Sequence, residues 1–422
     1  MLKTILNAFS VVDIRKKLAF TAAILLLYRL GSYIPAPGVD TQAVEEIAGN
    51  FSGSGVLPFL DLFSGGGLSR LSLFALGIMP YITASIILQL LTVVVPSLER
   101  LQKEGEVGQQ KITQYTRYLT VGLAFGQSIG YVFLFESFGQ GSTSVVGNLT
   151  FPKLMLLVLC LTAGCTLLMW MGELITQRGI GNGISLMIFA SIVSELVPGL
   201  SKWWNNPDQV FVVMMPFIAL AVIVAIVFVQ EGQRRIPVQY AKRVVGRKMT
   251  SGGSTYLPLR VNMAGVIPVI FAASIMAFPP TIGQLINTPA ALDFAAFFSP
   301  DGWAYVVGEV FFIIIFTYFY TAVTFNPVDQ ADNLKKYGGF IPGVRPGRPT
   351  AEYLDRVLSR LTFPGALYLG AVAALPTILI SQTAANFYFG GTSILIVVGV
   401  ALDTVKQLEA QLMMRNYEGF LK

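Results

Sequence analysis

The stretch VLPFLDLFSGGGLSRLSLFALGIMPYITASIILQLLTVVV, residues 56–95, decides the fold of the chain. It is almost wholly apolar, yet it is too long for one membrane-spanning helix of about 20 residues, and Gly65, Gly66 and Gly67 interrupt it. Residues 71–95 predict a transmembrane helix. Residues 56–70 are too short to cross the bilayer and too apolar to remain in water. We expect them to fold back into a protein-lined cavity, where non-helical backbone is tolerated at membrane depth; an external loop with an amphipathic turn is the alternative.

The remainder of the 422-residue chain has the same apolar character. Hydrophobic residues make up 54% of it and charged residues 12%, and its mean hydropathy is +0.65. A soluble domain of this length could not bury so much apolar surface. The apolar stretches predict an all-α membrane protein of ten spans at residues 18–36, 71–95, 115–138, 153–172, 183–200, 210–230, 261–282, 303–325, 361–381 and 392–408.

The basic residues predict the orientation of these spans. With the N-terminus inside, all but Arg29, Arg70, Lys153 and Lys202 of the 29 Lys and Arg lie in cytoplasmic segments or at their borders, as the positive-inside rule requires. Both termini are therefore expected in the cytoplasm. The net charge of +6 follows from topology and does not indicate a nucleic-acid substrate. The first apolar run continues past Leu30 without a cleavage site, so it is expected to be a retained span.

Ten spans divide into two groups of five, which must enter the membrane with opposite orientations. We expect an inverted repeat with an N-terminal half at residues 1–200 and a C-terminal half at residues 201–422, and with a pathway between them. Two cytoplasmic loops, residues 231–260 and 326–360, are long and basic. Long ordered loops usually bind something, although contact with lipid headgroups is the simpler explanation for any single basic residue.

The sequence excludes most catalytic chemistry, and no cofactor or metal site is predicted. Histidine is absent, and Cys160 and Cys165 lie on different faces of one predicted helix, so a disulfide or metal pair is not expected. The run at residues 179–183 has the pattern G-x-G-x-G without a preceding strand or a following GK[ST], which favours a helix start after a tight turn over a phosphate site.

An ion-coupled secondary transporter of a small solute is harder to exclude, because inverted repeats and broken helices suit it. Such a protein needs charged residues at mid-depth, whereas Glu195, Glu309 and Asp403 lie near predicted span ends, where they can reach the interface. Arg29 is the one basic residue within a span, and we expect it to snorkel or to find a local acceptor. An uncharged interior favours a bulky or varied substrate.

Several long motifs occur in an order that resembles the SecY/Sec61-alpha family of protein-conducting channels, and the resemblance covers the whole chain. They are LFSGGGLSRLSLFALGIMPYITAS from Leu62, LYRLGSYIPAPGVD from Leu27, MWMGELITQRGIGNGIS from Met169, EGQRRIPVQYAKR from Glu231, NMAGVIPVIFAASI from Asn262, NPVDQADNLKKYGGFIPGVRPG from Asn326 and YFGGTSILIVV from Tyr388. The resemblance implies a clamshell of ten helices around an hourglass pore, and no enzymatic activity.

The resemblance also implies the parts of the pore. A ring of isoleucines would form its constriction, at Ile78, Ile82, Ile184, Ile188, Ile270 and Ile396. A plug within residues 56–70 would close it, comprising Phe59, Leu60, Asp61, Leu62, Phe63, Ser64, Gly65, Gly66, Gly67, Leu68, Ser69 and Arg70. A lateral gate would open toward lipid between the second and third spans and the seventh and eighth, where Thr83, Gln127 and Asn262 would hold it closed by hydrogen bonds.

The resemblance finally implies the partners. In the family the two basic loops dock the SecA motor and the ribosome; Arg345 matches the arginine on which motor-driven transport depends, and Lys242, Arg243, Arg247 and Lys248 match the ribosome-facing loop in general character. SecE and SecG subunits, signal peptides, preproteins and membrane lipids are the other implied partners. The implied location is the bacterial plasma membrane, with unfolded preproteins crossing it and transmembrane segments released sideways.

Overall fold

The computed structural model describes residues 11–44, 61–138, 150–204, 209–240, 243–245, 248–250, 254–276, 279, 283, 288–298, 302–383 and 391–419. A helix occupies each of the ten predicted spans. These helices are α2 (Val12–Gly31), α5 (Met79–Val94), α7 (Glu106–Phe138), α8 (Phe151–Arg178), α9 (Gly183–Trp204), α10 (Gln209–Glu231), α11 (Ile267–Met276), α14 (Trp303–Thr324), α16 (Arg348–Thr383) and α17 (Gly391–Gly419).

Among the described residues, α7, α8, α14 and α16 contain segments long and apolar enough to cross a membrane by themselves. The bent pair formed by α5 and α6 (Pro96–Lys103) adds a fifth candidate, with a break of 99° between its helices. Pro96 explains the break, because the residue before a proline is pushed into extended backbone and Val95 has φ −99° and ψ 111°. The shorter apolar helical segments are Gly183–Leu196, Pro216–Glu231 and Ile267–Met276.

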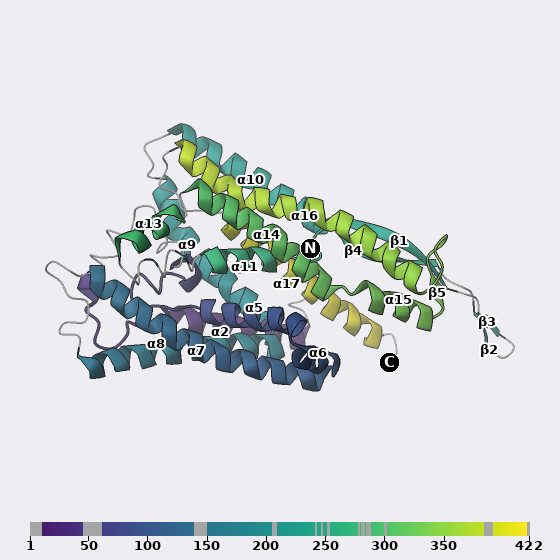
Figure 1. Cartoon of the computed structure of the whole chain (residues 1–422), viewed down its shortest axis with the longest axis horizontal. Helices are drawn as coiled ribbons and strands as arrows, with labels where there is room; N and C mark the ends of the chain where they lie inside the picture. The colour runs from purple at the N-terminus through teal and green to yellow at the C-terminus, as the bar shows by residue number, and fades with distance from the viewer. Residues whose placement is uncertain are drawn as a thin grey trace.

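The helices form two groups that meet in the middle of the molecule. In Figure 1, α7 and α8 run along one long side, α10, α14 and α16 run along the other, and α5, α9, α11 and α17 lie between them. α8 packs against α2, α7 and α9, while α14 packs against α11 and α16. Contacts of α5 with α11 and of α9 with α17 join the two groups.

The second span does not begin as a helix. The prediction for residues 71–95 is wrong for residues 71–78, because the helix begins at Met79, with Pro80 in its first turn. Leu71 has φ +41° and Gly77 has φ +56°, and neither conformation can continue an α-helix. The backbone of this segment is instead hydrogen-bonded to the chain after α2, by Ala36 N to Leu71 O (2.9 Å) and Leu73 N to Ile34 O (2.9 Å).

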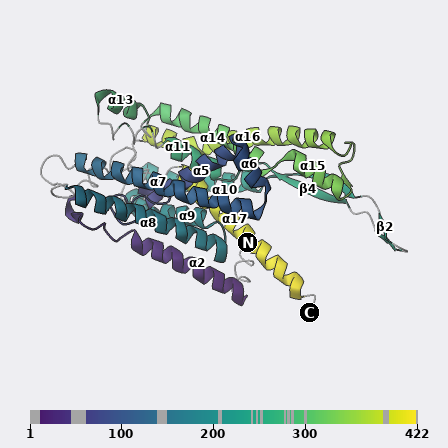
Figure 2. The same cartoon turned by 60° about the horizontal axis from the view of Figure 1, so that its bottom comes forward.

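Several helices are longer than their apolar spans. α7 begins at Glu106, α8 continues to Arg178, α16 begins at Arg348 and α17 continues to Gly419. Figure 2 shows the end of α17 projecting beyond the other helices. Where α7 and α8 lie side by side in this region, Arg117 donates two hydrogen bonds to the Glu173 carboxylate, from Nε (2.9 Å) and from Nη2 (2.5 Å).

The two basic loops fold into one unit at the end of the molecule where α16 begins. β1 (Gln233–Tyr240) lies between β4 (Ser254–Arg260) and β5 (Gly339–Phe340) in an antiparallel sheet. β2 (Arg243–Val245) and β3 (Lys248–Thr250) form a hairpin at its tip, and α15 (Pro327–Lys336) leads into β5. A short helix, α13 (Pro289–Phe297), lies at the opposite end of the molecule (Figure 1). None of these strands was predicted from the sequence.

Candidate functional site

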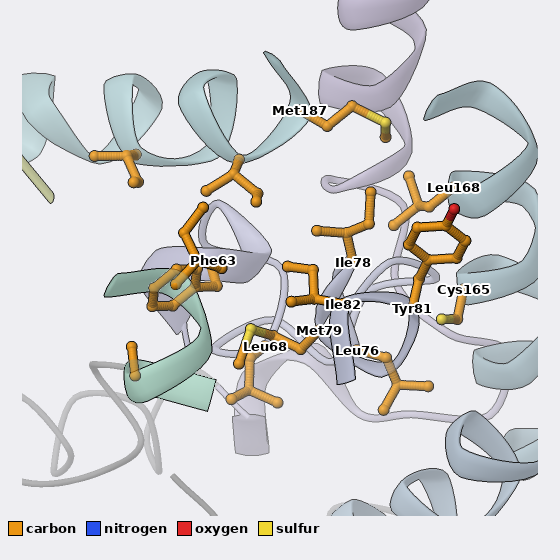
Figure 3. Close-up of a cluster of buried hydrophobic side chains, with 14 of the residues drawn as sticks. Phe63, Leu68, Leu76, Ile78, Met79, Tyr81, Ile82, Cys165, Leu168 and Met187 are labelled. Atoms are coloured by element: carbon orange, nitrogen blue, oxygen red, sulfur yellow. The ribbon is translucent and has the colours of Figure 1, made fainter. Parts of the chain in front are cut away.

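The six predicted ring isoleucines belong to one continuous buried cluster. Ile78 is the N-cap residue of α5 and Ile82 lies in its first turns; Ile184 and Ile188 come from α9, Ile270 from α11 and Ile396 from α17. Five of the side chains are at most 4% exposed, and Ile184 packs against the cluster while partly buried. In Figure 3, Ile78 and Ile82 lie among the labelled side chains of Phe63, Met187 and Leu168. Both halves of the chain therefore contribute to one apolar centre.

The predicted plug forms a compact turn inside the molecule. Phe59 and Leu60 lie outside the described residues; residues 61–64 are helical and residues 63–68 are buried. The Asp61 carboxylate organises the turn: Oδ1 accepts from the amides of Leu68 (2.9 Å) and Ser69 (3.1 Å), and Oδ2 accepts from the Ser69 hydroxyl (2.6 Å). Ser64 Oγ also donates to Oδ1 (2.9 Å). We call this hydrogen-bonded set the Asp61 turn; its burial agrees with a protein-lined cavity and not with an external loop.

The Asp61 turn is bound to α2 and α9. The Tyr28 hydroxyl lies 3.1 Å from the carbonyl of Ser64 and 2.5 Å from Ser191 Oγ, and Arg29 Nη1 donates to the carbonyl of Gly65. The prediction of a local acceptor for Arg29 is therefore confirmed. Arg29 and Arg70 also lie over the ring of Tyr33, at 4.8 and 4.3 Å from its centroid.

Glycine is required in the Asp61 turn by both conformation and space. Gly65 and Gly66 have φ +66° and +78°, a region that side chains rarely adopt. A Cβ on Gly65 would lie 3.2 Å from the Tyr28 hydroxyl, and one on Gly66 would lie 2.7 Å from Glu195 Oε1. The glycine run that interrupts the apolar stretch thus allows the turn to lie directly on its neighbours.

The three predicted gate residues are not hydrogen-bonded to one another in the described part of the chain. Thr83 Oγ1 donates to the carbonyl of Met79 in its own helix (3.0 Å), and Asn262 Nδ2 donates to the carbonyl of Gly265 (2.9 Å). Gln127 is partly buried on α7. The polar contact that does join α5 to α11 is between Ser274 Oγ and Met79 Sδ, at 4.0 Å. Sequence reasoning missed this pair, because neither residue is distinctive among apolar helices.

Glu309 does not reach the interface, contrary to the expectation for a residue near a span end. Its side chain is 2% exposed, and its Oε1 has no hydrogen-bond partner among the described residues. The helix α14 begins at Trp303, which places Glu309 almost two turns inside, against other helices. Cys160 is partly buried and Cys165 is buried, and both are free thiols. The turn at residues 179–182 precedes α9, so the glycines there mark a helix start, as predicted.

The strand unit has its own apolar core, separate from the pore cluster. Its buried members are Ile236, Val238, Leu259, Phe325, Ile341, Leu354, Val357 and Leu358. They come from both predicted loops, from Phe325 at the end of α14 and from the first turns of α16, so the two loops pack on one shared core. Alternation of Ile236 and Val238 with polar neighbours in RIPVQ was the available signal for β1.

Arg345 lies exposed in the turn between β5 and α16. Gly343 (φ +84°) and Gly347 (φ +102°) flank it, and its carbonyl accepts a hydrogen bond from Thr350 Oγ1 (2.8 Å). The turn thus holds the backbone in place while the guanidinium projects outward. Of the other predicted docking residues, Arg243 lies in β2 and Lys248 in β3, whereas Lys242 and Arg247 lie outside the described residues.

Known proteins resemble this chain over its whole length. The family model described as SecY matches residues 72–405. The protein translocase subunit SecY of Mycobacterium tuberculosis (strain ATCC 25618 / H37Rv) is 50% identical over 443 residues, covering 100% of both chains. A solved structure described as "The plug domain of the SecY protein stablizes the closed state of the translocation channel and maintains a membrane seal" matches with a TM-score of 0.64 at 21% identity, covering 93% of this chain and 91% of that one.

A second solved structure, described as "Sec61 in the Canine ribosome-channel complex from the endoplasmic reticulum", matches with a TM-score of 0.60 at 20% identity and with the same coverage. At these identities the two structures show the shared fold. The helical membrane architecture predicted from the sequence is thereby confirmed.

Proposed function

Because the chain belongs to the SecY family, and is therefore a protein-conducting channel and not an enzyme or a small-solute transporter, we propose that its six clustered isoleucines form the pore constriction. The observation that carries this proposal is their shared burial: α5 and α9 of one half and α11 and α17 of the other bring five of them into the buried apolar core, and Ile184 packs against it. Branched apolar side chains offer water and ions no hydrogen-bond partner, so a narrow ring of them closes by dewetting. The same side chains can shift around varied polypeptides.

Photocrosslinking tests the constriction. A photoreactive residue at Ile82 or Ile188 is expected to label a preprotein stalled in the channel many times more strongly than one at Leu159 or Leu220. These two controls are 58% and 60% exposed on α8 and α10 and face away from the cluster. Equal labelling at the four positions would contradict the ring.

The Asp61 turn is proposed as part of the plug that closes the resting pore. Its support is the burial of residues 63–68 and the presence of Phe63 and Leu68 in the same cluster as the ring. The match to a structure described as a plug that maintains a membrane seal points the same way. The halves at residues 1–200 and 201–422, with inverted orientations, are proposed on the same family basis.

The lateral gate is proposed along the contact of α5 with α11, with Thr83, Gln127 and Asn262 beside it. A hydrophobic signal peptide would replace this contact and then enter the lipid. Such a ligand opens the gate only as far as it binds the open state better than the closed one. The weak Ser274 to Met79 contact suits a seam that must separate.

The strand unit is proposed as the docking surface for SecA and the ribosome, in a bacterial plasma membrane with both termini in the cytoplasm. SecE and SecG subunits are proposed partners from the family alone. Support for docking comes from the exposed Arg345, held in a turn with a fixed backbone, and from the rigid core beneath it. An exposed guanidinium can donate two parallel hydrogen bonds to one carboxylate.

We expect Arg345→Glu to reduce motor-driven transport into membrane vesicles at least about tenfold, because charge reversal at a bidentate contact both removes attraction and adds repulsion. Arg348→Glu is the matched control: it makes the same charge change three residues away, at a side chain that is 90% exposed and pairs with Glu352. It should leave transport close to normal. Equal loss in both variants would show a general charge effect and would contradict a specific role for Arg345.

A further inference from the structure

Two successive side chains of α2 bind two successive carbonyls of the Asp61 turn. Tyr28 faces the carbonyl of Ser64, and Arg29 donates to the carbonyl of Gly65. Tyr28 and Ser64 are 2% and 1% exposed, so the first of these bonds is shielded from water. A third side chain, Ser191 of α9, contacts the Tyr28 hydroxyl at 2.5 Å and is also 2% exposed. Three separate segments therefore meet at one phenolic oxygen.

The number of protons at this junction determines which group donates to the carbonyl of Ser64. The Tyr28 hydroxyl carries one proton, and the Ser64 carbonyl can only accept. If Tyr28 donates to that carbonyl, its oxygen can accept from the Ser191 hydroxyl, whose one proton has the carbonyl of Met187 (3.0 Å) as its other acceptor. When Ser191 donates to Tyr28, the chain runs from Ser191 to Tyr28 to the carbonyl of Ser64, and each bond strengthens the next by polarisation.

We propose that Tyr28, Arg29 and Ser191 form a latch that holds the plug in its closed position. The latch rests on the proposed function, because it assumes that the Asp61 turn is the plug. The Asp61 turn keeps its internal hydrogen bonds whether or not it is docked, so the turn can leave as a unit. Undocking breaks the two carbonyl contacts with α2 and also withdraws Phe63 and Leu68 from the apolar cluster. The freed carbonyls can then bind water, so the two contacts with α2 are the polar part of what a substrate must release.

The close fit supports docking and not chance proximity. A Cβ on Gly65 would lie 3.2 Å from the Tyr28 hydroxyl, 3.3 Å from Arg29 Nη1 and 3.3 Å from the Ser191 Cα. All three latch residues therefore surround the same glycine. The backbone of α9 and the side-chain ends of Tyr28 and Arg29 on α2 thus lie close against Gly65, so that an added Cβ would force them to shift.

A thiol-labelling experiment on the full-length channel in its membrane tests the latch. Leu68→Cys, at a position 2% exposed, is introduced with Cys160→Ala in every variant, and labelling by a maleimide reports opening of the plug. The native Cys165, 1% exposed on α8, reports general loosening of the same half. The variants are Tyr28→Phe, Ser191→Ala and, as the control, Tyr368→Phe, which removes a hydroxyl that has no partner in the described residues.

Tyr28→Phe is expected to raise labelling at position 68 about fivefold, the factor for one buried hydrogen bond of typical net strength, with labelling of Cys165 unchanged. Ser191→Ala should have a smaller effect in the same direction, because it leaves the bond from Tyr28 to Ser64 in place. Tyr368→Phe should change neither rate. Unchanged labelling at position 68 in Tyr28→Phe, or a parallel rise at Cys165, would overturn the latch.

Ion flux through the same resting membranes separates the latch from the plug. If labelling and ion flux both rise in Tyr28→Phe, the latch and the plug are both supported. If labelling rises while the flux stays at the wild-type level, the latch stands and the Asp61 turn is not the seal.

Discussion

Replacing Gly164 by alanine is expected to destabilise the channel by about 3 kcal/mol or more, at the upper end of what overpacking a core does. A Cβ at this position of α8 would lie 1.9 Å from the carbonyl oxygen of Leu73 and 2.9 Å from its carbonyl carbon. A flexible side chain could move away from such a clash, but backbone cannot. Either α8 or the segment at residues 71–78 would have to shift.

The segment at residues 71–78 has little freedom to shift, which is why the expected effect is large. It is non-helical and buried at membrane depth. Backbone N–H and C=O groups of the segment find their partners through hydrogen bonds to the chain after α2. Displacing it would leave backbone groups unpaired where no water can replace the lost partners. It would also move Ile78, the last residue of the segment and the N-cap residue of α5.

Gly126→Ala on α7 is the matched control, because it makes the same change in another membrane-spanning helix. A Cβ there would meet nothing within 4 Å, so we expect no loss and a gain of up to about 1 kcal/mol from helix propensity. The measurement is the temperature at which half of the detergent-extracted channel aggregates, together with the amount of protein in the membrane. Similar behaviour of the two variants would show that the approach of Leu73 to α8 is not tight.

Hydropathy could predict the ten helices but not their ends. An apolar stretch reports the thickness of the bilayer, whereas a helix continues as long as its backbone is hydrogen-bonded. Residues 106–114 in α7 and residues 348–360 in α16 are therefore helical although they were predicted to lie outside the spans. For residues 71–78 the prediction fails in the other direction: a helix was predicted where the chain is irregular. The segment is apolar, and hydropathy cannot reveal the positive φ angles of Leu71 and Gly77 that prevent a helix.

The ring and the latch differ in how far sequence could reveal them. The isoleucines were assigned through a resemblance, and their spacing alone gave no reason to choose them among the many aliphatic residues of the spans. Tyr28 and Ser191 were not predicted at all. Tyr28 acts on a backbone carbonyl, which every residue has, and Ser191 acts through Tyr28, so no complementary side chain in the Asp61 turn indicates their role. Arg29 was noticed only because a charge within a span must find an acceptor.

The Asp61 carboxylate is expected to be the residue on which the plug depends most. It accepts four hydrogen bonds, two from backbone amides and two from serine hydroxyls. Asp61→Ala removes the acceptor of the Ser69 amide and leaves the Leu68 amide with Ser64 Oγ (2.9 Å) alone, and an unsatisfied buried donor costs about 1–3 kcal/mol. The turn should unfold, and the ion flux through resting membranes should rise well beyond the effect of Tyr28→Phe, with normal amounts of protein.

Asp61→Asn separates the hydrogen-bonding role from charge. The amide oxygen of asparagine can still accept from Leu68 and Ser69, whereas its NH₂ group cannot accept from the Ser69 hydroxyl. We therefore expect a flux between those of the wild type and Asp61→Ala. Asp40→Ala is the control, since the exposed Asp40 also accepts from a backbone amide, that of Gln42 (3.0 Å), but lies outside the plug. If Asp61→Asn leaks as much as Asp61→Ala, the negative charge and not the hydrogen-bonded turn keeps the channel closed.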